Sequence, residues 1–269
     1  AREKALYRGH VIAAVAAVSS SVAEEALSLI DVQYEVLAPV LDAYEAMQKD
    51  APILHERLVT LSNPNSRAGG YGENEEDQGT NISNQFEFRV GDVDQAFKEA
   101  DLVVEREFHT KPVHQGYIEP HSATALWNAD ESVTVWCSTQ GHFVLRDHTA
   151  AILGISVSRV KIVPMEIGGG FGGKGMGGCY LEPVTAVLSR KTGQPVKISM
   201  TRTEVFEGTG PTSGSHIRVK IGATKDGRIT AAEAHLIYEA GAFPGSPVSS
   251  GCRTMLAPYE IATAYIEGI

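Results

Sequence analysis

The order of apolar and polar positions predicts that the chain begins with strands and a helix. The apolar run Tyr7–Val18 reads as a buried strand that is too short to cross a membrane. Ser21 and Glu24 have capping-box spacing in front of an apolar stretch, which predicts a helix. Asp31–Leu37 then alternates between polar and apolar residues, as a half-buried strand does. These elements predict a small α/β unit, which we place at residues 1–60.

A polar stretch separates this unit from the rest of the chain. Asp42, with Glu45 three residues later, predicts one more short helix within the first unit. Residues 61–84 then hold Gly, Asn, Ser and acidic residues with few apolar ones, which indicates a linker. Its acidic run at 72–78 is typical of a solvated surface. The second, larger region is expected at residues 85–269.

The larger region mixes predicted helices and strands without an internal repeat. Helices are predicted at 92–100, 141–153 and 180–191, and strands at 102–108, 122–127, 132–138, 160–163, 196–200, 216–223 and 228–240. Gly154 and Gly193 follow the second and third helices, where glycine commonly ends a helix. The predicted fold class is therefore α+β, a mixed α/β architecture.

Composition narrows the possible roles. The chain has 269 residues, 43% hydrophobic and 21% charged, as globular proteins do. Its net charge of −10 argues against binding to a nucleic-acid backbone. No apolar run approaches the roughly 20 residues that span a bilayer, and no secretory leader is visible. We therefore expect a cytoplasmic protein that binds neither nucleic acid nor membrane.

The cysteines and the last residues add two expectations. Cys137, Cys179 and Cys252 are odd in number and widely spaced, which predicts free thiols in a reducing compartment. A predicted strand is only beginning where the sequence reaches 267–269, so we expect a piece of a longer protein or one chain of a split one.

The strongest local feature is the glycine loop, Gly168–Gly178, in which eight of eleven residues are Gly. It lies between a predicted strand and a predicted helix. Glycine lets backbone N–H groups turn inward and lets a ligand approach the main chain closely. The start of a helix also favours an anion. The loop is therefore a candidate binding site.

Three generic interpretations of this loop compete. A phosphate-binding GxxxxGK pattern ends at Lys174, but Gly175 stands where the magnesium-binding hydroxyl belongs. The GxGxxG dinucleotide pattern starting at Gly168 also fits, yet a run with so many glycines matches it easily. A merely flexible loop would not explain the large apolar Phe171 among the glycines.

A fourth interpretation rests on more of the chain. The sequence IGGGFGGK resembles the molybdenum-binding subunit of the xanthine dehydrogenase and aldehyde oxidase family. Further segments resemble that family in the expected order: YRGHVIAAV (7–15), VQYEVLAPV (32–40), HQGYIEPH (114–121), VWCSTQ (135–140), TGQPVK (192–197), TRTE (201–204) and PYEI (258–261). The resemblance extends over essentially the whole chain, so it outweighs the generic patterns.

The resemblance implies a fold and a function. The fold would be a partial hammerhead-like α/β domain followed by the first half of a molybdenum-cofactor-binding domain. Family members hydroxylate a carbon of an aldehyde, an N-heterocycle or a related centre with oxygen from water, and electrons leave through molybdenum. The expected cofactor is a molybdenum–pterin, as molybdopterin cytosine dinucleotide, held through its pterin dithiolene rather than by protein ligands.

The resemblance also implies partners that this chain does not contain. They are the C-terminal half of the molybdenum subunit, iron–sulfur and flavin subunits carrying [2Fe-2S] and FAD, and a small-molecule substrate. The family's catalytic base is a Glu in a later Gly-rich motif, and no candidate for it occurs here. We therefore expect the isolated chain to be inactive. The alternative is a non-catalytic apo domain or a standalone pterin- or nucleotide-binding module.

By the same resemblance, Gln140 is the expected catalytic residue, donating a hydrogen bond to a ligand of molybdenum. Its alternative role is to cap the following helix. The expected cofactor-binding residues are Gly169, Gly170, Phe171, Gly172 and Gly173, with the N–H groups around Phe171 and Gly172 facing the metal. Gly175 departs from purine-oxidising members, which have Glu there, so a purine substrate is in doubt.

Other reactive residues favour structural roles. Glu119 lies in a matched motif, which allows a place near the substrate, but a structural carboxylate is the simpler reading. His109, His114 and His121 fit no zinc spacing and read as surface or loop histidines. Cys137 alternates with Val133 and Val135, which predicts a core thiol rather than a nucleophile.

Overall fold

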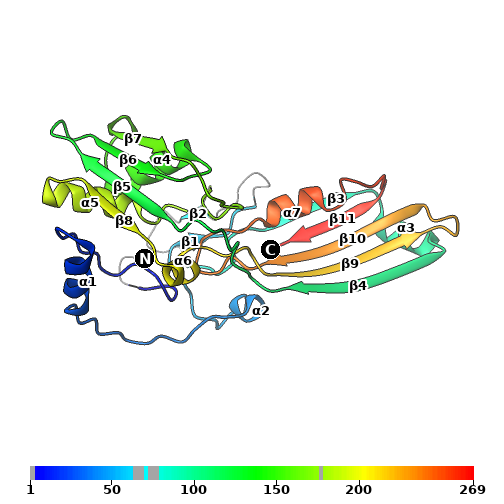
Figure 1. The fold of residues 1–269 in the computed structure, drawn as a ribbon. Coiled ribbons are helices and arrows are strands. Elements are labelled where there is room, and N and C mark those ends of the chain that lie inside the picture. Colours follow the sequence, from blue (N-terminus) through cyan, green and yellow to red (C-terminus); the bar gives the residue numbers. More distant parts are fainter. Residues whose placement is uncertain (1–3, 63–69, 72–78, 176–177) are drawn as a thin grey trace. The chain divides into compact units, whose positions relative to one another are not determined.

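The computed structural model describes residues 4–62, 70–71, 79–175 and 178–269 (Figure 1). They form two compact units. Unit 1 comprises Ala1–Val36 and His114–Thr212, and unit 2 comprises Leu37–Val113 and Ser213–Ile269. Each unit is therefore built from two separate stretches of sequence.

Unit 1 contains a four-stranded mixed sheet. Its strands, in the order β7-β6-β5-β8, are β5 (Ser122–Trp127), β6 (Val133–Cys137), β7 (Val160–Pro164) and β8 (Val196–Ser199). β5 runs antiparallel to both β6 and β8, whereas β6 and β7 are parallel. The parallel pair needs a crossover, and helix α4 (His142–Leu153) provides it.

The described residues of unit 1 also form three further helices and one 3-10 turn. They are α1 (Ser20–Ser28), α5 (Glu182–Thr192), α6 (Arg202–Gly208) and η1 (Val157–Arg159). Gly154 and Gly193 end α4 and α5 in the left-handed conformation, as predicted. Alternate residues of β5 and β6 face the core, including Ala125, Val135 and Cys137. These side chains are buried because alternate residues of a strand point to the same face of the sheet.

Unit 2 contains a five-stranded mixed sheet. Its strands, in the order β3-β11-β10-β9-β4, are β3 (Phe86–Val90), β4 (Leu102–Thr110), β9 (Ser215–Ala223), β10 (Ile229–Tyr238) and β11 (Ala264–Gly268). Only β10 and β11 are parallel. The smaller elements are α2 (Ala43–Ala46), α3 (Val93–Glu99), α7 (Val248–Thr254), β1 (Leu58–Val59) and β2 (Gly70–Tyr71).

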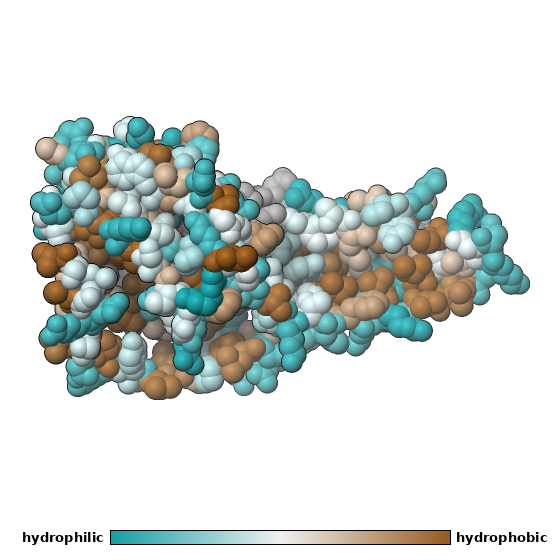
Figure 2. Space-filling model, viewed as in Figure 1, coloured by the Kyte–Doolittle hydropathy of each residue, from teal (hydrophilic) through white to brown (hydrophobic). Residues whose placement is uncertain are grey.

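Helix α7 forms the second core on one face of this sheet. Its Val248 and Cys252 pack with Leu236 and Ile266, and all four side chains are buried. Figure 2 shows apolar side chains gathered over the five-stranded sheet. The two units therefore have separate hydrophobic cores.

Two predicted strands near the N-terminus are wrong. Tyr7–Val18 and Asp31–Leu37 are extended or turn-like, but neither pairs with another strand among the described residues. The first is not buried either, because Val11 is 48% and Val18 99% exposed. An alternating pattern can specify an extended segment, but a strand also needs a neighbour for its N–H and C=O groups.

The remaining predicted elements agree closely with the structure, and the mixed α/β fold class is confirmed. The first helix is present, although its N-cap is Ser19, which accepts a hydrogen bond from the Val22 N–H, and not Ser21.

The domain limits at residues 60 and 84 stay a prediction. The acidic run at 72–78 lies outside the described residues, and β2 falls within the expected linker. In the described part of the chain, no helix is long and apolar enough to span a membrane.

Candidate cofactor site

The first residue of the glycine loop is tied to Glu119. The Gly168 N–H donates to Glu119 Oε2 at 2.6 Å, and the Glu119 N–H donates to the Gly168 carbonyl at 3.2 Å. Glu119 lies three residues before β5, and the loop follows β7. This pair of hydrogen bonds therefore fixes where the loop leaves the sheet.

Lys174 ties the other side of the loop to the same carboxylate. Its Nζ lies 2.7 Å from Glu119 Oε2 and 3.3 Å from Ser138 Oγ. The Lys174 side chain is fully buried, and that of Glu119 is 31% exposed. Burial pushes the pKa of Glu119 upward, but hydrogen bonds from Lys174 and Gly168 outweigh it and hold the pKa below its ordinary value. A lysine buried in this way does not reach out to a phosphate, which argues against the GxxxxGK interpretation.

Gln140 contacts the middle of the loop. Its Oε1 accepts from the Gly172 N–H at 2.9 Å, and its backbone N–H donates to the Lys174 carbonyl at 2.8 Å. The helix-capping alternative is wrong, because Gly141 is the N-cap of α4 and no side chain caps this helix. The two Nε2 protons have no acceptor among the described residues, so they are available to donate.

The loop presents free backbone donors next to Gln140. The N–H groups of Gly169, Gly170 and Phe171 have no acceptor in the described part of the chain, whereas Gly172 donates to Gln140. Phe171 has a φ of 48° and is 75% exposed. A non-glycine residue in this conformation is unfavourable and often marks a functional site. Successive N–H groups in such a turn form a concave site for an anion.

Two glycines in the loop are required by this arrangement. A Cβ at Gly170 would lie 2.6 Å from Gln140 Oε1, so any side chain would displace the glutamine amide. Gly172 has a φ of +91°, which L side chains rarely adopt. The residues that the resemblance assigned to cofactor binding are thus brought together in one loop beside Gln140. Their role toward a cofactor stays a prediction.

A buried polar chain supports the loop. Tyr117 Oη lies 2.6 Å from His121 Nε2 and 3.2 Å from Thr209 Oγ1, and His114 Nε2 lies 2.8 Å from the same Thr209 oxygen. The Lys174 Nζ sits 5.1 Å from the centre of the Tyr117 ring, a cation–π contact. These side-chain contacts therefore connect the motif HQGYIEPH (114–121) with Lys174 of the motif IGGGFGGK.

His121 corrects one expectation from the sequence. It is only 6% exposed, so it is not a surface histidine. Burial, followed by the positive charge of Lys174, lowers its pKa to about 4. His121 is therefore neutral at physiological pH and serves as a hydrogen-bond partner of Tyr117.

Lys174 and Tyr117 are the residues that sequence reasoning missed. Both lie inside matched motifs, which was the only available signal, since the Lys174 contacts with Glu119 and Ser138 come from positions far away in the sequence. Cys137 is a buried core thiol whose pKa is raised by burial, as predicted. No group of three or more His, Cys, Asp or Glu side chains that could hold a metal ion occurs among the described residues.

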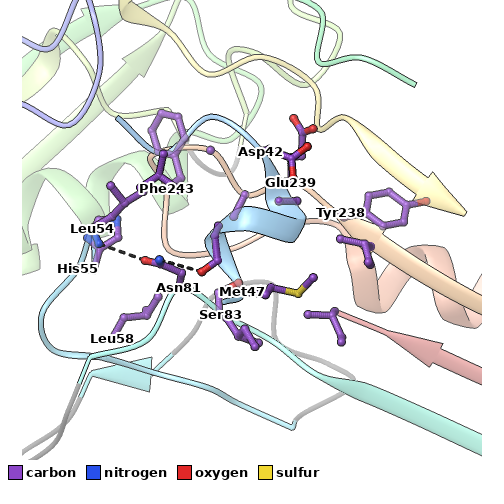
Figure 3. Close-up of a pocket in the computed structure, with 18 of the residues that line it drawn as sticks. Asp42, Met47, Leu54, His55, Leu58, Asn81, Ser83, Tyr238, Glu239 and Phe243 are labelled. Atoms are coloured by element: carbon purple, nitrogen blue, oxygen red, sulfur yellow. Dashed lines mark hydrogen bonds between the residues drawn. The ribbon is translucent and has the colours of Figure 1, made fainter. Parts of the chain in front are cut away.

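Unit 2 contains a separate cavity of about 110 Å³ (Figure 3). Three of its polar side chains, Asp42, His55 and Asn81, are engaged with the backbone. Asn81 bonds to the Leu54 N–H and the Ala46 carbonyl, Asp42 caps α2, and His55 Nε2 lies 2.8 Å from the Ala242 carbonyl. These contacts hold the surrounding loops together, so the cavity offers little chemistry compared with the glycine loop.

Comparison with known proteins decides the family. The family model described as "Molybdopterin cofactor-binding domain" matches residues 74–269. The chain belongs to this family. The recognition of a xanthine dehydrogenase and aldehyde oxidase relative is therefore confirmed.

Similar molybdopterin-domain proteins include named oxidoreductases. The chain is 34% identical over 266 residues to "Probable hypoxanthine oxidase XdhD" of Escherichia coli (strain K12), covering 93% of this chain and 28% of that protein. It is 31% identical to "Nicotinate dehydrogenase large molybdopterin subunit" of Eubacterium barkeri, covering 96% and 56%. The solved CO dehydrogenase of Oligotropha carboxidovorans superposes with a TM-score of 0.71 and 25% identity, covering 93% and 31%. The chain thus spans well under two thirds of each relative.

Proposed function

We propose that the glycine loop binds a molybdenum–pterin cofactor and that the chain is part of a molybdenum-dependent hydroxylase. One observation carries this proposal: three adjacent backbone N–H groups that have no acceptor among the described residues lie beside the Gln140 amide, whose oxygen already accepts from the Gly172 N–H. Such a row of N–H donors suits an anionic group rather than a bare metal ion.

The residues of this chain would hold and orient the group. The N–H groups of Gly169, Gly170 and Phe171 would donate to the cofactor, and the Gly172 N–H, by holding Gln140 Oε1, would leave Nε2 available to donate to it as well. The absence of side chains at Gly170 and Gly172 leaves room for close approach. When bound, the cofactor supplies two-electron redox chemistry that amino-acid side chains lack.

The finer assignments are part of the same proposal. The cofactor is molybdopterin cytosine dinucleotide, and electrons pass to [2Fe-2S] and FAD on partner subunits in the cytoplasm. The substrate is an aldehyde or an N-heterocycle, and the name of the nicotinate dehydrogenase relative supports the heterocycle. Gly175 offers no side chain to recognise a purine, in contrast to the Glu expected in purine oxidisers.

The test uses the complete subunit with its partners. Metal mass spectrometry and fluorescence of the oxidised pterin should find stoichiometric molybdenum and pterin. Gln140→Ala should lower turnover of aldehydes or N-heterocycles with a dye acceptor by about 100-fold, as loss of one positioned donor does. Its melting temperature should stay close to that of the wild type.

Gln194→Ala is the matched control, because Gln194 is an exposed glutamine of the same unit whose side chain makes no hydrogen bond within the described residues. It should retain full turnover. A complete wild-type complex that contains neither molybdenum nor pterin would refute the proposed function. Equal turnover of the two alanine variants would refute the role of Gln140.

A further inference from the structure

One carboxylate oxygen joins both sides of the glycine loop. Glu119 Oε2 accepts from the Gly168 N–H at 2.6 Å and from Lys174 Nζ at 2.7 Å. The free N–H groups of Gly169, Gly170 and Phe171 lie in the sequence between these two attachment points. The separation of the attachment points, and with it the curvature of the intervening backbone, therefore depends on Glu119.

The ion pair allows little freedom. The Lys174 side chain has no exposed surface, and Glu119 is its only carboxylate partner in the described part of the chain. Its other contacts are the neutral Ser138 hydroxyl and the Tyr117 ring. A buried ammonium that leaves this carboxylate would remain without a counter-charge, which is strongly unfavourable. The pair therefore selects one loop shape among the many that a glycine-rich backbone permits.

Gln140 connects the Glu119–Lys174 pair, which we call the clamp, to the part of the loop that is expected to face the metal. Its backbone N–H and the Thr139 hydroxyl both donate to the Lys174 carbonyl, at 2.8 and 3.3 Å. Any displacement of Lys174 therefore acts on both the loop and the residue that the loop orients.

We propose that Glu119 is a positioning residue that, together with Lys174, holds the glycine loop in the shape that retains the anionic cofactor. This inference rests on the proposed function. It goes further, because it predicts that cofactor retention depends on the pair separately from folding.

The experiment compares four forms of the complete subunit with its partners: wild type, Glu119→Gln, Lys174→Met and the double variant. Each single variant should lower the melting temperature and the molybdenum and pterin content, because Glu119→Gln leaves the buried Lys174 ammonium without a counter-charge and Lys174→Met leaves the partly buried Glu119 carboxylate without one. The double variant should recover most of the melting temperature, since no buried charge remains. It should still release pterin about 10-fold faster than the wild type, the effect typical of losing a supporting hydrogen-bond partner.

Hydrogen exchange supplies a readout that does not need the cofactor. In the double variant the loop amides at 168–175 should exchange faster, while those of β5 and β6 should stay as in the wild type. Glu131→Gln is the matched control, because Glu131 pairs with Arg190 in the same unit but both side chains are more than half exposed. It should change neither retention nor exchange.

The outcomes separate the two proposals. A wild-type complex without molybdenum and pterin refutes the proposed function. A loaded wild type with a double variant that regains both stability and wild-type pterin release overturns the clamp, since the pair would then be merely structural. If the double variant does not fold, Glu119→Asp decides. Aspartate keeps the negative charge but holds it farther from Lys174, because its side chain is shorter by one methylene. Wild-type pterin release from this variant also overturns the clamp.

Discussion

The two units use ion pairs of nearly equal length in different surroundings. In unit 1, Lys174 and Glu119 meet at 2.7 Å with the lysine side chain fully buried. In unit 2, Arg218 and Glu105 meet at 2.8 Å across β9 and β4, with side chains 39% and 45% exposed. Water reaches both side chains of the second pair, but in the first pair it cannot reach the lysine. Burial, rather than distance, therefore decides which pair restrains the backbone.

The histidines show the same contrast. His121 of unit 1 is buried against Tyr117, whereas His235 of unit 2 lies between Glu233 and Glu267 on the sheet surface. His109 and His216 also meet on neighbouring strands of unit 2, with their Nδ1 atoms 2.7 Å apart. These histidines of unit 2 thus lie on the surface of a sheet, whereas His121 of unit 1 is buried next to the candidate site.

The largest expected effect tests the contrast between the ion pairs. Glu119→Gln should lower the free energy of unfolding by about 3 kcal/mol, because it leaves a buried ammonium without its counter-charge. Glu105→Gln is the matched change in the exposed pair and should leave unfolding unchanged within error. Urea denaturation of both variants measures this. Equal losses would show that burial does not govern the two pairs.

A smaller effect is expected on the pH dependence of folding stability. The folded-state pKa of His121, about 4, lies below its ordinary value of 6.5, so only the unfolded state takes up a proton as the pH falls through 6.5. Stability from this residue is complete above 6.5 and is lost as the pH approaches 4. Between about pH 7.5 and pH 5 this contributes a loss of about 2 kcal/mol.

His121→Gln should remove that contribution while keeping a polar partner for Tyr117. The stability of the variant, measured by urea denaturation, should therefore fall less steeply with acid than that of the wild type. Parallel curves for the two proteins would mean that His121 takes up its proton in the folded state as readily as in the unfolded chain.

The smallest effect on stability is expected from Gly170→Ala. The new Cβ meets only the end of the flexible Gln140 side chain, so unfolding should change by about 1 kcal/mol or less. The Gln140–Gly172 hydrogen bond should nevertheless be lost, which faster exchange of the Gly172 amide would report. Gly141→Ala, where a Cβ meets nothing within 4 Å, is the control. An unchanged exchange rate of the Gly172 amide would contradict its hydrogen bond to Gln140.

Much of the fold could be predicted because its signals are local. Asp92 caps α3, Gly154 ends α4, and the hairpin of β5 and β6 follows its turn residues. The strands expected at Tyr7–Val18 and Asp31–Leu37 failed because pairing depends on a neighbour that the pattern does not encode. The mixed order of the five-stranded sheet, with β11 between β3 and β10, was also not visible in the sequence.

The residues of the candidate site were predicted from the sequence, but the contacts that hold them in place were not. The matched motifs brought out Gln140 and the loop glycines. The burial of Lys174 was not foreseen, because a lysine after glycines usually indicates a phosphate ligand and its partner lies 55 positions earlier. The structural interpretation of Glu119 was the better of the two considered, since the carboxylate bonds to the loop.

The nesting of the two units in the sequence has a consequence for biosynthesis. β3 and β4 are translated before the second stretch of unit 1, and β9 only after it, so that Arg218 joins Glu105 across 113 positions. Such distant pairings slow folding. Within unit 1, however, His114 lies 2.8 Å from Thr209, so the ends of the intervening stretch meet once it folds. Early folding of that stretch on the ribosome would shorten the time during which β3 and β4 lack their partner strands. Unpaired strand edges promote aggregation.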